Sequence, residues 1–159
     1  MDSTCKNCVF SISYAKQILA DIDEARMAER PMGLNSPAWL LLDLATAADY
    51  AANSLGGRGI CPETWNALAD TKKEPSTNLA DYPSKEELLK TLEAAYMNTV
   101  TLWQACSEEK RNEPQKLGFF ENEFPTIGDI ATFLMVTHAN THLGQLSAWR
   151  RAMGKPPLF

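Results

Sequence analysis

Apolar residues recur at the three- and four-residue spacing of an amphipathic helix along four stretches of the chain, and no stretch shows the alternating pattern of a half-buried strand. The pattern predicts helices over residues 9–29, 36–55, 84–106 and 126–153. Three of these starts carry capping signals: Ser36 before Pro37, Ser84 with Glu87, and Thr126 with Asp129. Four helices of about twenty residues each predict an all-α fold, a four-helix bundle.

The connection between the second and third predicted helices, residues 56–83, is too long for a tight turn. It contains Pro62, Pro75 and Pro83, and a short helix is predicted near residues 63–69. Connections of this length are often lids or binding loops. The sequence therefore predicts a bundle with a long crossover between helices 2 and 3, and its length of 159 residues fits a single domain spanning residues 1–159.

Fifteen basic and 20 acidic side chains give the chain a formal net charge of -5. This balance argues against a nucleic-acid surface, because binding to phosphates depends on clustered lysine and arginine. No apolar run approaches the ~20 residues that cross a bilayer, and the first residues lack the basic segment and apolar run of an export signal. We therefore expect a cytoplasmic protein with neither a nucleic-acid nor a membrane partner.

Two of the four cysteines, Cys5 and Cys8, have the spacing of half a zinc ribbon, but no second pair follows them. They are either a redox or metal clip or two reduced thiols near a frayed terminus, and a reducing cytosol favours the thiols. Cys106 falls within a helical apolar pattern and is expected to be a small buried hydrophobic residue.

The only two histidines of the chain, His138 and His142, are four residues apart in the last predicted helix, so both rings lie on one helical face. The other members of that face are mostly apolar: Ile127, Ala131, Leu134, Gln145, Trp149 and Met153. Buried imidazoles need partners, which either a shared metal ion or hydrogen bonds to neighbouring helices would supply. A metal site needs a third ligand, so the pair alone does not decide.

Asp43 in the second predicted helix is the best candidate for that third ligand. It shares a helical face with four other residues: Trp39, Thr46, Tyr50 and Asn53. A carboxylate on a polar face is most simply solvated, whereas a tryptophan and a tyrosine beside it are typical of a wet pocket wall. The helical wheel leaves both interpretations open.

Three segments of the chain, the last two of them close together near its end, carry a resemblance. Residues 36–45 are SPAWLLLDLA, residues 138–146 are HANTHLGQL, and residues 149–156 are WRRAMGKP. They resemble the second and last helices of the DinB-like superfamily, whose signatures are a Trp four residues before a metal-binding His, and a His-x3-His-x-Gly-Gln motif followed by an Arg-rich turn and a Gly-x-Pro ending.

The resemblance implies a four-helix fold with a long crossover, often a homodimer, in which three histidines hold zinc, nickel or a similar divalent ion. Characterised members include enzymes that use bacillithiol or mycothiol, either adding the thiol to an electrophile or isomerising maleylpyruvate. In this chain Asp43 stands where the family has its first histidine. Two imidazoles and a carboxylate still form a competent site, which favours harder ions such as iron(II) or manganese more than three histidines would. The alternative is that this lineage has lost the metal.

We expect Asp43, His138 and His142 to hold one divalent ion, either zinc, nickel, iron or manganese. Such an ion activates a water or a low-molecular-weight thiol as a nucleophile, which predicts a thiol S-transferase or a hydrolase acting on a small-molecule substrate. The residues expected to bind that substrate are Trp39, Tyr50, Gln145 and Trp149.

The alternative is a metal-free dimeric bundle with a ligand-binding or structural role. Phe133, Val136 and Leu143 lie on the side of the last predicted helix opposite the histidines. A helix that is apolar on two sides buries both, either in its own core or in a subunit interface. This pattern favours a homodimer without indicating an activity.

Overall fold

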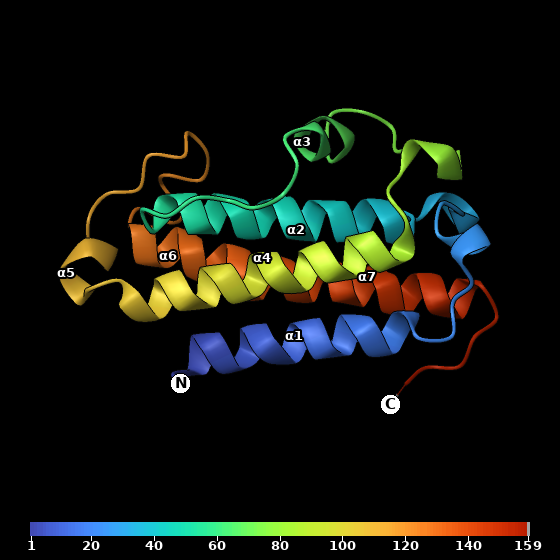
Figure 1. Cartoon of the computed structure of the whole chain (residues 1–159), viewed down its shortest axis with the longest axis horizontal. Coiled ribbons are helices and arrows are strands. Elements are labelled where there is room, and N and C mark those ends of the chain that lie inside the picture. The colour runs from blue at the N-terminus through green and yellow to red at the C-terminus, as the bar shows by residue number, and fades with distance from the viewer. Residues whose placement is uncertain (159) are drawn as a thin grey trace.

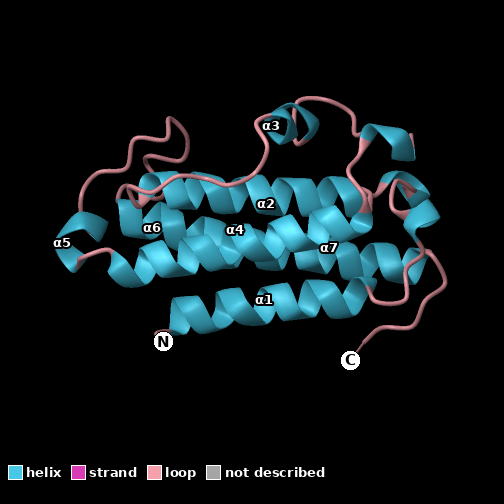
Figure 2. Ribbon diagram, in the orientation of Figure 1, coloured by secondary structure: helices cyan, strands magenta, loops and turns pink. Residues whose placement is uncertain are grey.

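The computed structural model describes residues 1–158, which form helices and loops without a strand (Figure 2). The all-α prediction is confirmed. Four long helical segments lie side by side (Figure 1): α1 (Ser3–Leu19), α2 (Pro37–Ser54), α4 (Lys85–Ala105), and a last segment made of α6 (Ile127–Thr132), a π-helical turn (Phe133–His138) and α7 (Ala139–Ala152). The short elements are α3 (Thr64–Leu68), α5 (Glu108–Arg111) and 3-10 turns at Glu24–Arg26, Pro31–Gly33 and Leu79–Asp81.

The helices α2, α4 and α6 begin where their capping residues predict. The hydroxyl of Ser36 accepts the backbone N–H of Trp39, and Ser84 caps α4 in the same way. Thr126 and Asp129 form a complete capping box, in which each side chain accepts the backbone N–H of the other residue. Each of these bonds satisfies a donor that the first helical turn cannot.

The first helix starts and ends earlier than the pattern predicts. Asp2 caps α1, so the helix begins at Ser3. Beyond Leu19 the backbone leaves the α-helix, and the Lys85 ammonium of α4 donates to the carbonyls of Leu19 and Ile22. A side chain from elsewhere in the fold thus satisfies the carbonyls at this helix end, and the prediction of one helix over residues 9–29 is wrong for this reason.

Cys5 and Cys8 lie inside α1 with no exposed surface and without a disulfide bond. Burial raises the pKa of the Cys5 thiol to about 11 and that of the Cys8 thiol to about 12. Both are therefore protonated and unreactive at neutral pH, and they belong to the core rather than to a frayed terminus. Cys106 is only partly buried, because it stands at the C-terminal cap of α4.

The long crossover between α2 and α4 passes along α2 and carries α3 over that helix (Figure 1). The Asp49 carboxylate of α2 accepts the backbone N–H groups of Ile60 and Cys61, at 2.9 and 2.8 Å. Trp65 of α3 is buried. The crossover is thus tied to the helix that it covers.

Most residues of α2 are buried, including the consecutive Leu40, Leu41 and Leu42. A helix with buried side chains all round its axis lies in the interior, and α2 contacts α4, α6, α7, the π-helical turn and α3. Asp43 lies in the middle of this helix, so it is surrounded by protein rather than by solvent. None of the described helices combines the length and the apolar character needed to cross a membrane.

Candidate metal centre

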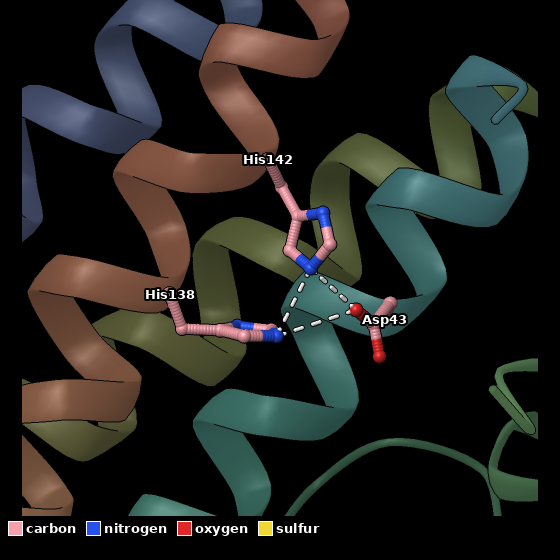
Figure 3. A group of neighbouring side chains, drawn as sticks. All are labelled: Asp43, His138 and His142. Carbon is pink, nitrogen blue, oxygen red and sulfur yellow. Dashed lines mark hydrogen bonds and ion pairs between the residues drawn. The ribbon is translucent and has the colours of Figure 1, made fainter. Parts of the chain in front are cut away.

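Asp43, His138 and His142, called the triad below, converge between α2 and the last helical segment (Figure 3). Asp43 Oδ2 lies 2.7 Å from Nε2 of His142 and 3.3 Å from Nε2 of His138, and the two Nε2 atoms lie 3.0 Å apart. Asp43, from the first third of the chain, thus presents an oxygen to the same point at which the two histidines, from near its end, present their nitrogens.

The triad is largely shielded from solvent, with 13% of the Asp43 side chain, 10% of His142 and 21% of His138 exposed. Burial raises the pKa of Asp43, but the hydrogen bonds from His138 and His142 outweigh it and hold that pKa at about 2. Burial lowers the pKa of His142, but the Asp43 carboxylate outweighs it, so that pKa is raised. Asp43 is therefore a carboxylate at neutral pH, as a metal ligand must be.

The spacing of the three atoms fits a single metal ion. Atoms separated by 2.7, 3.0 and 3.3 Å lie on a circle of radius about 1.8 Å, which is shorter than the ~2.0–2.2 Å bonds from zinc to imidazole nitrogen or carboxylate oxygen. One ion can therefore reach all three atoms. Two imidazoles and a carboxylate are also a donor set that zinc, iron and related divalent ions accept.

The backbone around His138 is unusual. Residues Phe133–His138 form a π-helical turn, in which hydrogen bonds join residues five apart instead of four. Residues five apart then share a face, and the Phe133 ring centroid lies 6.1 Å from that of His138. The prediction that Phe133 lies opposite the histidines is wrong, because it assumed a regular α-helix. Leu143, in contrast, is buried within the chain's own core.

Gln145 and Trp39 orient His142. Gln145 Oε1 lies 3.0 Å from His142 Nδ1 and accepts a hydrogen bond from it, which orients the ring so that Nε2 faces the triad. The Trp39 ring packs against the His142 ring at 79°, with centroids 6.2 Å apart. His138 is held differently: its Nδ1 is buried without a hydrogen-bond partner among the described residues.

A pocket of about 540 Å³ opens beside the triad, with Asp43 and His138 in its wall. Its volume lies within the ~300–1,000 Å³ range of small-molecule sites. The remaining lining residues come from α2, from the crossover, from the loop after α5 and from the last helical segment: Thr46, Ala47, Tyr50, Asn66, Ala69, Asp70, Thr71, Phe119, Phe120, Phe133 and Leu134.

Of the four residues expected to bind substrate, Tyr50 lines this pocket, 42% exposed. Trp39 and Gln145 contact His142 instead. Trp149 lies apart from the pocket: its indole is fully buried and donates to the carbonyl of Glu29 at 2.7 Å. Its surroundings are those of a core residue.

The pocket also contains residues that the sequence reasoning did not select. Phe119 and Phe120 belong to a loop in which three of the six phenylalanines of the chain fall within six positions. Phenylalanines outside a helical pattern need another apolar surface, and their density here was a usable signal. Asn66 and Asp70 lie in the crossover, whose length alone indicated a binding role.

The chain matches no protein-family model, no curated protein and no solved structure. A functional inference therefore has to be drawn from the geometry of the triad and its pocket, together with the sequence motifs.

Proposed function

We propose that Asp43, His138 and His142 hold one divalent cation and that the chain is a metal-dependent enzyme acting on a small molecule in the adjoining pocket. The observation that carries this proposal is the meeting of three ligand atoms within a triangle of 2.7 to 3.3 Å in the wall of a cavity of about 540 Å³. A polar cluster that serves only structure has no need of such a cavity.

The proposal includes DinB-like membership, as a homodimer in the cytoplasm. Supporting it are the His-x3-His-x-Gly-Gln motif at His138, the Trp39–Asp43 spacing, and a long crossover between the second and third long helices. The carboxylate in place of the first histidine favours a harder ion, iron(II) or manganese, over the zinc or nickel of a site with three histidines.

A bound ion supplies Lewis acidity, which lowers the pKa of a coordinated water or thiol and makes a nucleophile available at neutral pH. The side chains of this site do the rest. Asp43 brings the negative charge that offsets part of the ion's charge, and Gln145 fixes the ring of His142. Tyr50, Phe119 and Phe133 line the cavity with apolar surface, against which the apolar part of a small substrate can pack. This arrangement supports a hydrolase or a thiol S-transferase as the proposed activity.

The proposal is tested by measuring bound metal in protein purified without a metal-affinity tag. We expect near-stoichiometric metal in the wild type and none in the His138→Ala, His142→Ala double variant. Asp43→Asn should lose most of the metal, whereas the matched control Asp23→Asn, at an exposed position without a side-chain cap bond, should keep it.

Metal-free protein gives the second measurement. Zinc, nickel, iron(II) and manganese should each raise the thermal unfolding temperature of the wild type, and a tighter ion should raise it more, since an ion that binds only the folded state stabilises it. Unchanged unfolding temperatures with all four ions would favour the metal-free bundle. Ester hydrolysis, assayed against transfer of a low-molecular-weight thiol to an electrophile, then separates the two enzyme classes.

A further inference from the structure

The pocket beside the triad has a wall of aromatic rings that leads to the triad. Ring contacts join Tyr50 to Phe119, Phe119 to Phe120, and Phe120 to Phe133, with centroids 5.9, 5.8 and 5.6 Å apart. Phe133 in turn lies beside His138. The first three pairs meet at 69° to 84°, so neighbouring rings pack edge to face.

Two of these rings are unusually exposed for their size. Tyr50 is 42% exposed and Phe120 is 51% exposed, although both belong to a ring cluster. The backbone of Phe120 has φ +53°, a left-handed conformation that bulky residues rarely adopt. Strain of this kind persists where the surrounding structure fixes it, and it is concentrated at ligand contacts.

The charges that line this pocket are acidic. Asp43 and Asp70 both line it, and the described lining contains neither lysine nor arginine; its one basic side chain, His138, pairs with Asp43. Asp70 accepts the backbone N–H of Lys72 and pairs with Lys73 at 3.5 Å, but the Lys73 side chain is 70% exposed. Such a surface pair neutralises little of the carboxylate's field. The formal net charge of -5 adds a general attraction for cations.

We propose that this pocket takes small organic cations, in which an ammonium group joined to an aromatic or other apolar body lies against the aromatic wall and the Asp70 carboxylate. The face of an aromatic ring attracts a cation, and the attraction grows when water is excluded. In the metal-free protein an anion would meet two carboxylates, and the only basic side chain of the described lining is His138, which already pairs with Asp43. As a statement about the substrate class, this inference rests on the proposed function. It specifies in addition that the substrate carries a positive charge.

Three probes of similar size test the inference on protein stripped of metal: benzylamine, which is protonated at pH 7, neutral benzyl alcohol, and benzoate. Affinities are measured by calorimetry and by ligand-observed NMR. We expect benzylamine to bind about tenfold more tightly than benzyl alcohol, and benzoate to bind more weakly than either. Equal binding of benzylamine and benzyl alcohol, tighter binding of benzoate, or no binding of benzylamine would overturn the proposal.

Variants then locate the preference. Asp70→Asn should weaken benzylamine about threefold to tenfold while leaving benzyl alcohol unchanged, and Asp23→Asn is its matched control. Phe120→Leu, which keeps an apolar side chain but removes the ring, should also weaken benzylamine, whereas Phe10→Leu, at a 58% exposed position on α1, should not. An equal loss in a variant and its control would place the preference outside this pocket and refute the inference.

Metal binding by the same variants keeps the two proposals apart. Asp70→Asn should bind metal as the wild type does, because Asp70 is not part of the triad. A wild type that binds metal but prefers benzoate when metal-free would refute the cation inference alone. A wild type that binds no metal but prefers benzylamine would refute the enzyme and leave an acidic, aromatic pocket for organic cations.

Discussion

Two clusters of charged residues join the last helical segment to the rest of the bundle, and they differ in how their polar atoms are satisfied. In the first, called the arginine cluster, Arg150 of α7 is buried and pairs with Asp21, and Lys155 donates to the same residue. The Arg150 guanidinium also donates to the carbonyls of Ile18 and Pro156, at 3.1 and 2.7 Å. Each guanidinium nitrogen has a partner supplied by the chain.

The triad is satisfied less completely. Its carboxylate and two imidazoles point at one another, the Nδ1 of His138 is buried without a partner among the described residues, and a cavity opens beside it. A buried polar atom without a partner is rare and costly. The arginine cluster is therefore interpreted as a structural contact that joins α7 to the end of α1. The triad, in contrast, has the features of a site for a ligand. Four experiments test this contrast.

The largest effect is expected from His142→Ala. Loss of a direct ligand should reduce metal affinity by at least ~100-fold, or about 2.7 kcal/mol, because even residues that only support a ligand contribute 10–100-fold. Titration of metal-free protein with zinc and manganese measures the loss. Thr141→Ala, at the exposed neighbouring position, should bind as the wild type does, and equal affinities for His142→Ala and wild type would remove the triad from consideration.

Arg150→Met should have the converse outcome. It leaves the carbonyls of Ile18 and Pro156 without a donor, and we expect the free energy of unfolding of the metal-free protein to fall by about 2 kcal/mol. Urea unfolding measures this change. Metal affinity should stay near that of the wild type, because the arginine cluster is separate from the triad. A variant of wild-type stability that has lost its metal would reverse the roles assigned to the two clusters.

Gln145→Ala should have a smaller effect on the triad. The variant removes the acceptor of the His142 Nδ1 proton, and metal affinity should fall about tenfold. Gln145→Glu keeps an acceptor at this position and should retain most of the affinity. Gln17→Ala, at an exposed position on α1, serves as the control, and a Gln145→Glu variant as weak as Gln145→Ala would contradict the role of Gln145 as the acceptor for His142 Nδ1.

Acid should reduce the contribution of the arginine cluster to the stability of the folded chain. The Arg150 guanidinium holds the pKa of Asp21 well below its usual value of ~3.9. A carboxyl group whose pKa is lowered by folding stabilises the folded state above its unfolded pKa, and this contribution is lost as pH falls toward the folded value. Asp21→Asn should therefore be less stable than wild type in urea at pH 7, and the difference should shrink below pH ~4. A difference independent of pH would show that the charge of Asp21 is unimportant.

The sequence was most informative where local chemistry decides the structure. Ser36, Ser84 and Thr126 cap the helices that they predict, because a cap and its first turn are neighbours along the chain. The spacing of His138 and His142 likewise identified both as members of one face. The metal itself stays a prediction.

Contacts between distant segments decided what the sequence could not. At the end of α1, the Lys85 ammonium donates to the carbonyls of Leu19 and Ile22, and nothing near those carbonyls in the sequence predicts this contact. The helical wheel left open whether Asp43 is solvated or lies in a pocket. A wheel describes one helix alone and does not include the crossover that covers α2. Phe133 was misplaced because a wheel assumes one helical period, and the π-helical turn changes it.

That turn has a consequence for how such a chain can diverge. A π-helical turn takes up one residue more than the α-helical turn it replaces, so the segment before it and the segment after it are set in different angular registers. A deletion of one amino acid here would leave the four-residue interval between the imidazoles intact while swinging Phe133 away from them. Codon gain or loss at this point is therefore a route by which the aromatic wall of the pocket and the triad can evolve separately.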